Sequence, residues 1–207
     1  VCQWGYDFRP SYLELPKLRE QLPEVPILAL TATATSEVVK DIKRVLHFRP
    51  GYAFYQKSFL RPNISYSIRR SDDKPAMMRF ILSRVEGAAI IYCRNRQLCQ
   101  TVSEALLAEG ISATYYHAGL TYTEREMRQG RWMRGEVRVM VATNAFGMGI
   151  DKPDVRLVIH LTMPSSLEEY YQEAGRAGRD GEHSYAVAIV GSQDSRMLHR
   201  RLQDTFP

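Results

Sequence analysis

The sequence lacks the short motifs with which many proteins hold a nucleoside triphosphate. No glycine is followed by lysine, so a G-x-x-x-x-G-K-[ST] phosphate loop is absent. No aspartate is followed by glutamate, so an Asp-Glu pair that could hold a metal ion is also absent. Because the chain begins with Val1 rather than Met, we expect it to be part of a longer protein. The main binding site for any triphosphate would then lie outside these residues.

Cysteine and long apolar runs are scarce as well. The three cysteines, Cys2, Cys93 and Cys99, are odd in number and form no C-x-x-C pair. We therefore expect neither a disulfide framework nor a zinc site within the chain, and a reducing cytoplasm is the expected location. No apolar run approaches membrane-spanning length and no signal-peptide pattern is present, so no membrane partner is expected.

The remaining composition is that of an ordinary globular protein. The chain has 207 residues, of which 44% are hydrophobic and 25% charged, enough for one or two domains with a proper core. The net charge of +5 permits a nucleic-acid partner but does not require one.

Strand and helix patterns alternate along most of the chain, which predicts an α/β fold with a doubly wound, mostly parallel sheet. We place a domain boundary near residues 57–61, where Pro, Gly and Asn interrupt the pattern, and so expect one unit at 1–57 and a second at 58–207. Strands are expected in the apolar runs 26–30, 52–56, 64–68, 88–92, 113–116, 137–142, 156–161 and 185–190.

The most distinctive stretch, residues 172–181, reads QEAGRAGRDG. Arg176 and Arg179 each follow a glycine, whose missing side chain lets a phosphate or another backbone come close. Arginine presents a fixed fork of donors that matches phosphate oxygens, and Gln172 adds an amide one turn earlier. The pattern favours a phosphate-binding segment; the alternative is a basic surface turn.

Polar residues follow three of the expected strands. Arg94 and Asn95 come after 88–92, His117 after 113–116, and Thr143 after 137–142. Since parallel strands end at the same edge of a sheet, we expect these residues, Thr31 and the segment before Arg176 to share one functional edge. Each also has a plain structural interpretation: Asn95 as a helix N-cap, Arg94 in a solvated loop, His117 as a structural histidine.

Two further groups carry candidate contacts. Thr121 and Glu124 form a capping box that begins a helix bearing Arg125, a candidate contact to a nucleic-acid backbone. In the stretch TNAFGMGID from residue 143, Gly147 lets the backbone approach a phosphate or ribose, and Asp151 could accept from a ribose hydroxyl. The alternative is a tight loop in which Asp151 caps locally.

The first third of the chain holds two more signals. Aromatic rings, including Trp4 and Phe8, interleave with Arg9 in a loop containing Gly and Pro, an arrangement suited to stacking single-stranded bases. These rings could instead anchor the loop in a core. Thr31 and Thr33 lie in a hydroxyl-rich turn after an apolar run, where a ligand could bind or the next helix could be capped.

Taken together, the aromatic loop, the Thr-Ala-Thr turn, AFGMGIDKPDVR and GRAGRDG resemble the RecQ family of superfamily 2 DNA helicases along nearly the whole chain. The resemblance implies the end of a first RecA-like lobe followed by a complete second lobe. It implies an ATP-dependent 3′-to-5′ DNA helicase of recombination and repair, with Arg179 as the arginine finger and Arg176 and Gln172 as nucleotide contacts.

The family also implies cofactors and partners. ATP with Mg²⁺ would be held mainly by the part of the first lobe outside this chain, and zinc would be bound only if a further domain follows Pro207. DNA, both single-stranded and at duplex junctions, is the expected partner, with a single-strand-binding protein or recombination proteins as further candidates. The protein would associate with a bacterial nucleoid, or lie in the nucleus if eukaryotic.

Two alternatives remain open at this point. The protein could be an RNA helicase of the same superfamily, because nothing in the residues encodes the sugar of the substrate. It could also be a helicase-derived lobe that only binds nucleic acid, although such a lobe would not need an arginine finger.

Overall fold

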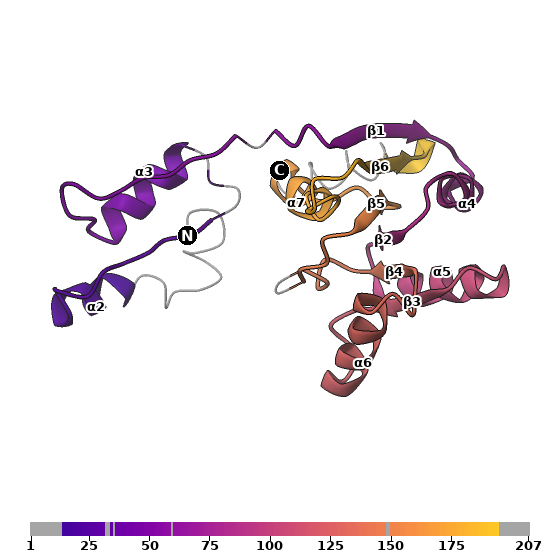
Figure 1. Ribbon diagram of the computed structural model, residues 1–207, viewed down its shortest axis with the longest axis horizontal. Coiled ribbons are helices and arrows are strands. Elements are labelled where there is room, and N and C mark those ends of the chain that lie inside the picture. The colour runs from indigo at the N-terminus through magenta and orange to yellow at the C-terminus, as the bar shows by residue number, and fades with distance from the viewer. Residues whose placement is uncertain (1–13, 32–33, 35, 59, 148–149, 195–207) are drawn as a thin grey trace. The chain divides into compact units, whose positions relative to one another are not determined.

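The computed structural model describes residues 14–31, 34, 36–58, 60–147 and 150–194 (Figure 1). The chain separates into two compact units, Val1–Phe59 and Leu60–Pro207. The expected aromatic loop lies outside the described residues, as do the candidate site residues Trp4, Phe8, Arg9 and Thr33.

The first unit contains two helices, α2 (Leu15–Gln21) and α3 (Ser36–Val45). Proline at position 16 fits the first turn of α2, where a backbone N–H would have no helical partner. The strands expected at 26–30 and 52–56 are not formed, so these two predictions are wrong. A strand requires a neighbour to pair its backbone groups, and the side chains of Leu28 and Leu30 are 81% and 84% exposed.

The second unit is built on a six-stranded sheet in the order β1-β6-β5-β2-β4-β3. Every neighbouring pair is parallel. This confirms the predicted α/β class with a doubly wound parallel sheet. The strands are β1 (Ile64–Arg70), β2 (Ala88–Tyr92), β3 (Ala113–Tyr116), β4 (Val139–Ala142), β5 (Val155–His160) and β6 (Ser184–Val190).

The three central strands β5, β2 and β4 are almost continuously buried, as strands covered on both faces must be. The helices are α4 (Lys74–Arg84), α5 (Arg96–Ala108), α6 (Tyr122–Met133) and α7 (Leu167–Ala174). In Figure 1, α4 and α5 lie on one side of the sheet and α7 on the other. Within the described residues, no helix is both long and apolar enough to cross a bilayer.

Each face of the sheet has its own apolar core. Met78, Leu82, Cys99 and Leu106 from α4 and α5 pack against one face. On the other face, Trp132 of α6 packs with Phe146 and Ile150, which follow β4, and with Ala174 of α7 and Ala177 just after it. The second core therefore brings together residues that follow β4 and residues at and just after the end of α7.

Local capping signals explain where the helices begin. The Asn95 side chain accepts a hydrogen bond from the N–H of Leu98 at 2.8 Å, and Thr121 with Glu124 forms a complete capping box, as predicted. Ser166 accepts from Glu169 N at 3.1 Å, but the Glu169 carboxylate accepts from the N–H one residue before Ser166. Ser166 and Glu169 thus form only half of a capping box.

Candidate functional site

The segment bearing the two arginines, which we call the arginine loop (residues 175–182), lies at the amino ends of two strands. Gly178 N donates to the carbonyl of Val155, the first residue of β5, at 2.8 Å, and Asp180 N donates to Pro153 O at 3.3 Å. Because α7 begins at the carboxyl edge and runs back along the sheet, it delivers the loop to the opposite edge. The expectation of one shared functional edge is therefore wrong for the arginine loop.

Arg179 meets the other candidate nucleotide residue directly. Its Nη1 donates to Asp151 Oδ1 at 2.9 Å and to Ile150 O at 3.0 Å. The Arg179 side chain is 36% exposed and that of Asp151 is 82% exposed, so this pair is open to solvent. The structure thus brings together two residues that lie far apart in the sequence, and it keeps the guanidinium accessible.

Arg176 is half-buried and lies against the segment that follows β4. A Cβ placed on Gly147 would come within 3.1 Å of Arg176 Nη2, so a larger residue would crowd the guanidinium. The Tyr92 hydroxyl, which donates to Phe146 O at 3.0 Å, faces the same guanidinium. Burial raises the pKa of the Tyr92 phenol and the positive charge of Arg176 opposes this only in part, so the phenol stays neutral.

A buried polar pair that the sequence analysis did not predict lies next to Tyr92. His160 Nε2 and Glu173 Oε2 are 2.8 Å apart, and the imidazole is completely buried. The Tyr92 ring stacks on the imidazole, with centroids 5.4 Å apart and planes at 19°. Burying such groups is costly unless they are paired, so the pair fixes α7 relative to the centre of the sheet. Glu173 follows Gln172 and precedes Arg176 by three residues, a helical spacing that could have indicated a shared face.

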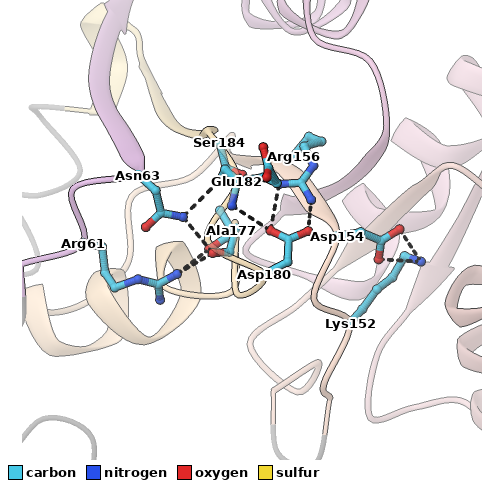
Figure 2. A network of polar contacts seen from close by, with 10 residues as sticks. Arg61, Asn63, Lys152, Asp154, Arg156, Ala177, Asp180, Glu182 and Ser184 are labelled. Carbon is cyan, nitrogen blue, oxygen red and sulfur yellow. Dashed lines mark hydrogen bonds and ion pairs between the residues drawn. The ribbon is translucent and has the colours of Figure 1, made fainter.

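Side chains from the start of the second unit hold the arginine loop (Figure 2). Arg61 donates to Gly178 O at 2.7 Å, to Ala177 O at 3.2 Å and to Gly175 O at 3.3 Å. The Asn63 amide donates to Gly178 O at 2.7 Å and to Glu182 O at 3.0 Å. Neither residue was expected in the site, because nothing in the sequence near Arg61 points to a segment more than a hundred residues away.

The far side of the loop is held by an ion pair. Arg156 of β5 donates to both carboxylate oxygens of Asp180 and to Ser184 Oγ (Figure 2). The hydrogen bonds to Asp180, above all those from Arg156, lower the pKa of its carboxyl below the ordinary value. Gly178 has a φ of +55°, and a Cβ there would lie 2.5 Å from Asn63 Nδ2, so only glycine fits between the two arginines.

Lys152 anchors the chain beyond Asp151. Its Nζ donates to Met133 O at 3.1 Å and pairs with Asp154 at 3.0 Å (Figure 2). The residue is only 6% exposed, and its ammonium lies 5.6 Å from the ring centroid of Trp132. The segment that carries Gly147 and Asp151 is therefore fixed where it reaches β5.

The carboxyl edge of the sheet carries the predicted contacts to nucleic acid. Arg94 is exposed and lines a cavity of about 110 Å³ next to β2. Asn95 is exposed and caps α5, so its predicted structural role is confirmed. Thr143 is buried, and its hydroxyl accepts from Ala145 N at 3.4 Å, which makes it part of a local turn. Arg94, Asn95 and Thr143 all follow the carboxyl ends of neighbouring strands, as expected.

His117 and Arg125 lie next to the edge strand β3. The His117 ring stacks on Tyr115 with centroids 5.6 Å apart, and the guanidinium of Arg128 lies 3.9 Å from the centroid of the same Tyr115 ring. Burial, and then the charge of Arg96, lower the pKa of His117, so its imidazole is neutral near pH 7. Arg125 is half-buried and lines an open pocket of about 680 Å³ with Tyr116 and Tyr122, among others.

Two remaining candidates are exposed. Gln172 lies on α7 one turn before Arg176. Thr31 lies in the first unit, and so the structure does not relate it to the arginine loop. The described parts of the second unit thus present two groups: the arginine loop with Asp151, Gly147 and Gln172, and the carboxyl-edge residues.

A comparison with known protein families assigns the fold and this arrangement to a class. Residues 73–181, just over half of the chain, match the family described as the helicase conserved C-terminal domain. The chain belongs to this family.

The similar proteins are DNA helicases of RecQ type. The chain is 44% identical to the RecQ-like DNA helicase blm-1 of Caenorhabditis elegans over 99% of its length, and 43% identical to the ATP-dependent DNA helicase RecQ of Pasteurella multocida over 98%. It spans 21% and 32% of those two proteins. Over nearly its whole length the chain is thus similar to part of RecQ-type DNA helicases, in agreement with the resemblance that its motifs indicated.

Solved structures agree on the fold. Saccharomyces cerevisiae Dbp5 bound to RNA and ADP BeF3 matches 92% of this chain and 51% of its own with a TM-score of 0.71. At 21% identity, that likeness concerns the fold alone. The Escherichia coli DEAD-box protein SrmB, bound to regulator of ribonuclease activity A, is 30% identical with a TM-score of 0.59, over 65% of this chain and 81% of its own. The second unit is thus a RecA-like helicase lobe.

Proposed function

We propose that this chain supplies the second motor lobe of an ATP-dependent 3′-to-5′ DNA helicase of RecQ type, which couples ATP hydrolysis to DNA unwinding in recombination and repair. The observation that carries the proposal is the arginine loop: an accessible guanidinium, Arg179, is held on a loop whose backbone is fixed by several distant side chains. Preorganised positive charge is what a phosphoryl-transfer transition state requires.

In this function Arg179 is the arginine finger. Its fork has five N–H donors, and the contacts to Asp151 and Ile150 use only Nη1, so the guanidinium can meet a γ-phosphate without leaving Asp151. Arg176 and Gln172 contact the nucleotide, and Gly147 leaves room for the Arg176 guanidinium. Asp151 orients the finger and accepts from a ribose hydroxyl.

Thr31 and Thr33 take part in coupling, as nucleotide-dependent contacts of the first unit. They lie in the hydroxyl-rich Thr-Ala-Thr turn, which resembles the turn that links ATP turnover to lobe movement in the family.

The carboxyl edge contacts DNA. Arg94, Asn95, Thr143 and Arg125 bind backbone phosphates, and the neutral His117 donates a hydrogen bond rather than a charge. The aromatic loop stacks bases through Trp4 and Phe8, with Arg9 beside them. We extend the proposal to single-stranded DNA and duplex junctions as substrates, and to a single-strand-binding protein or recombination proteins as partners.

ATP with Mg²⁺ is the expected nucleotide form. Among the described residues no cluster of three His, Cys, Asp or Glu side chains could hold a metal ion, so we assign no Mg²⁺ ligand to them. We propose that the metal and most of the triphosphate are held by a first lobe that carries a phosphate loop, and that zinc would be bound only if a further domain follows Pro207. The proposed location is the cytoplasm at the nucleoid, or the nucleus in a eukaryote.

The experiment that tests this function compares residues 1–207 with the full-length protein in a DNA-stimulated ATP hydrolysis assay. We expect turnover from the full-length protein and none from residues 1–207, which contain no Gly-Lys phosphate loop. Clear turnover by residues 1–207, after removal of contaminating ATPases, would overturn the proposal.

An RNA helicase of the same superfamily is the second candidate, since Dbp5 in the structural comparison is bound to RNA. The high identity to proteins named as DNA helicases supports DNA instead. Unwinding assays with matched DNA and RNA duplexes, using the full-length protein, separate the two. A lobe that only binds nucleic acid would show neither unwinding nor any effect of replacing Arg179 on ATP turnover.

A further inference from the structure

The residues that hold the arginine loop begin almost where the second unit begins. That unit starts at Leu60. Asn63 comes directly before β1, and Arg61 lies two residues earlier. The stretch between the last residue of the first unit and β1 is therefore also the stretch whose side chains reach the arginine loop.

Arg61 donates three hydrogen bonds to the turn that follows α7. Its guanidinium spans the carbonyls of residues 175, 177 and 178, at 3.3, 3.2 and 2.7 Å, which flank Arg176 and precede Arg179. These carbonyls lie in the turn beyond Ala174, the last residue of α7, so the helix supplies no N–H donors to them. The guanidinium reaches these oxygens from two separate nitrogens, Nη1 and Nη2, whereas the three N–H groups of a lysine ammonium all leave from one atom.

Asn63 closes the same loop from the other side. Its amide joins Gly178 O and Glu182 O, and its own carbonyl accepts from Ser184 N at 2.9 Å. Since no Cβ fits at Gly178, the loop has little freedom to shift relative to Asn63. Any movement of residues 61–63 must therefore carry the backbone around Arg176 and Arg179 with it.

We propose that Arg61, together with Asn63, is a positioning residue that ties the arginine finger to the segment through which the chain passes from the first unit to the second, so that movement of this segment places or withdraws Arg179. The proposal rests on the proposed function, in which Arg179 acts on a nucleotide.

The molecule contains an internal comparison for this role. Arg138 donates in the same way at the end of α4, to the carbonyls of Leu82, Val85 and Gly87 at 2.7, 2.5 and 3.1 Å. That helix end carries none of the candidate site residues. Arg138 therefore shows what a three-carbonyl arginine does when its role is only structural, and Arg61 should do more.

The test uses the full-length protein with Arg61→Gln and the matched control Arg138→Gln. Both should lower the melting temperature by similar amounts, because each removes three hydrogen bonds of the same kind. Arg61→Gln should also lower kcat for DNA-stimulated ATP hydrolysis about 10- to 100-fold with KM for ATP within about twofold of wild type, since a misplaced group loses transition-state contacts rather than ground-state binding. Arg138→Gln should change kcat less than about threefold.

A second readout does not depend on ATP turnover. Amide hydrogen exchange at Gly178 and Asp180 should accelerate about tenfold or more in Arg61→Gln and remain at the wild-type rate in Arg138→Gln. Equal losses of kcat in the two variants, or unchanged exchange at Gly178 in Arg61→Gln, would overturn the proposal. If wild type itself hydrolysed no ATP, the proposed function would fail, and the exchange data would still decide whether Arg61 positions the loop.

Should Arg61→Gln not fold, Arg61→Lys takes its place. A single ammonium can serve one or two of the three carbonyls, so we expect smaller changes in the same direction for both kcat and exchange. Wild-type behaviour of Arg61→Lys in both measurements would count against the need for a guanidinium fork.

Discussion

The arginine loop and the carboxyl edge of the sheet are held in place by different kinds of contact. The loop depends on Arg61 and Asn63, whose partners are more than a hundred residues away in the sequence. At the carboxyl edge, Asn95 bonds to the first turn of its own helix and Thr143 to its own turn. Long-range contacts fix the first group, and short-range contacts shape the second.

The difference matches what the proposed function asks each group to bind. Stabilising charge in a transition state requires a donor that is already in position, since reorganisation during the reaction would cost most of the benefit. A nucleic-acid backbone is a repeating and flexible ligand, so contacts to it tolerate local adjustment. We therefore expect changes to the arginine loop to have large effects and changes at the carboxyl edge to have small, salt-dependent ones.

The largest effect should come from Arg179→Ala in the full-length protein. Loss of a finger that contacts the γ-phosphate should lower kcat for DNA-stimulated ATP hydrolysis by about 10³-fold or more. Affinity for DNA, measured by fluorescence anisotropy without nucleotide, should remain at the wild-type value. The control is Arg69→Ala, an exposed residue of β1. A loss below about tenfold would remove Arg179 from the role of finger.

Gly178→Ala tests how rigidly the loop is held. The positive φ costs about 1–2 kcal/mol for alanine, and the clash with Asn63 and Ser184 about 1–3 kcal/mol more. Gly110→Ala is the matched control, because Gly110 has a φ of +79° with no atom within 4 Å of an added Cβ. Urea denaturation should show a clearly larger loss of unfolding free energy for Gly178→Ala. Equal losses would mean that the loop gives way easily.

Arg94→Ala should have a moderate effect that depends on salt. If Arg94 contacts one phosphate, its loss should weaken single-stranded DNA binding by about three- to tenfold at low salt and reduce the slope of log K against log salt by about 0.7. Arg84→Ala, exposed on α4, should change neither quantity. A salt slope identical to wild type for Arg94→Ala would argue against the phosphate contact.

The smallest effect concerns acid stability. The folded-state pKa of Asp180 is lowered below its ordinary 3.8, chiefly by hydrogen bonds from Arg156. Its contribution to stability is therefore present above the unfolded-state pKa and is lost as pH falls through the folded-state value. Asp180→Asn should flatten the acid side of the stability profile slightly, and Arg156→Gln should do the same. An unchanged acid limb in both variants would show that the pair contributes nothing to stability.

Local signals made much of the fold predictable. The bounds of β2 and β3 match the apolar runs from which they were expected, and the Asn95 cap and the Thr121 capping box form as their spacing indicates. These features depend on residues within a few positions of one another. The same logic failed for residues 26–30 and 52–56, because apolar composition alone does not supply a pairing partner.

What the sequence could not predict is the set of contacts between distant segments. The Arg61 contacts, the His160–Glu173 pair and the placement of the arginine loop at the amino ends of β5 and β6 all follow from the direction in which α7 crosses the sheet. Motif spacing identified Arg176, Arg179 and Asp151 as candidates. It did not indicate that Arg179 and Asp151 form an ion pair.

Under the proposed function the two ends of the Thr143–Asp151 stretch have one further consequence, because Thr143 follows the carboxyl end of β4 and Asp151 pairs with Arg179. If DNA binds at the first end and a nucleotide at the second, coupling between them is reciprocal: if DNA tightens nucleotide binding by a given factor, the nucleotide must tighten DNA binding by the same factor. In that case, each round of nucleotide hydrolysis would switch the affinity for the DNA strand between a high and a low value.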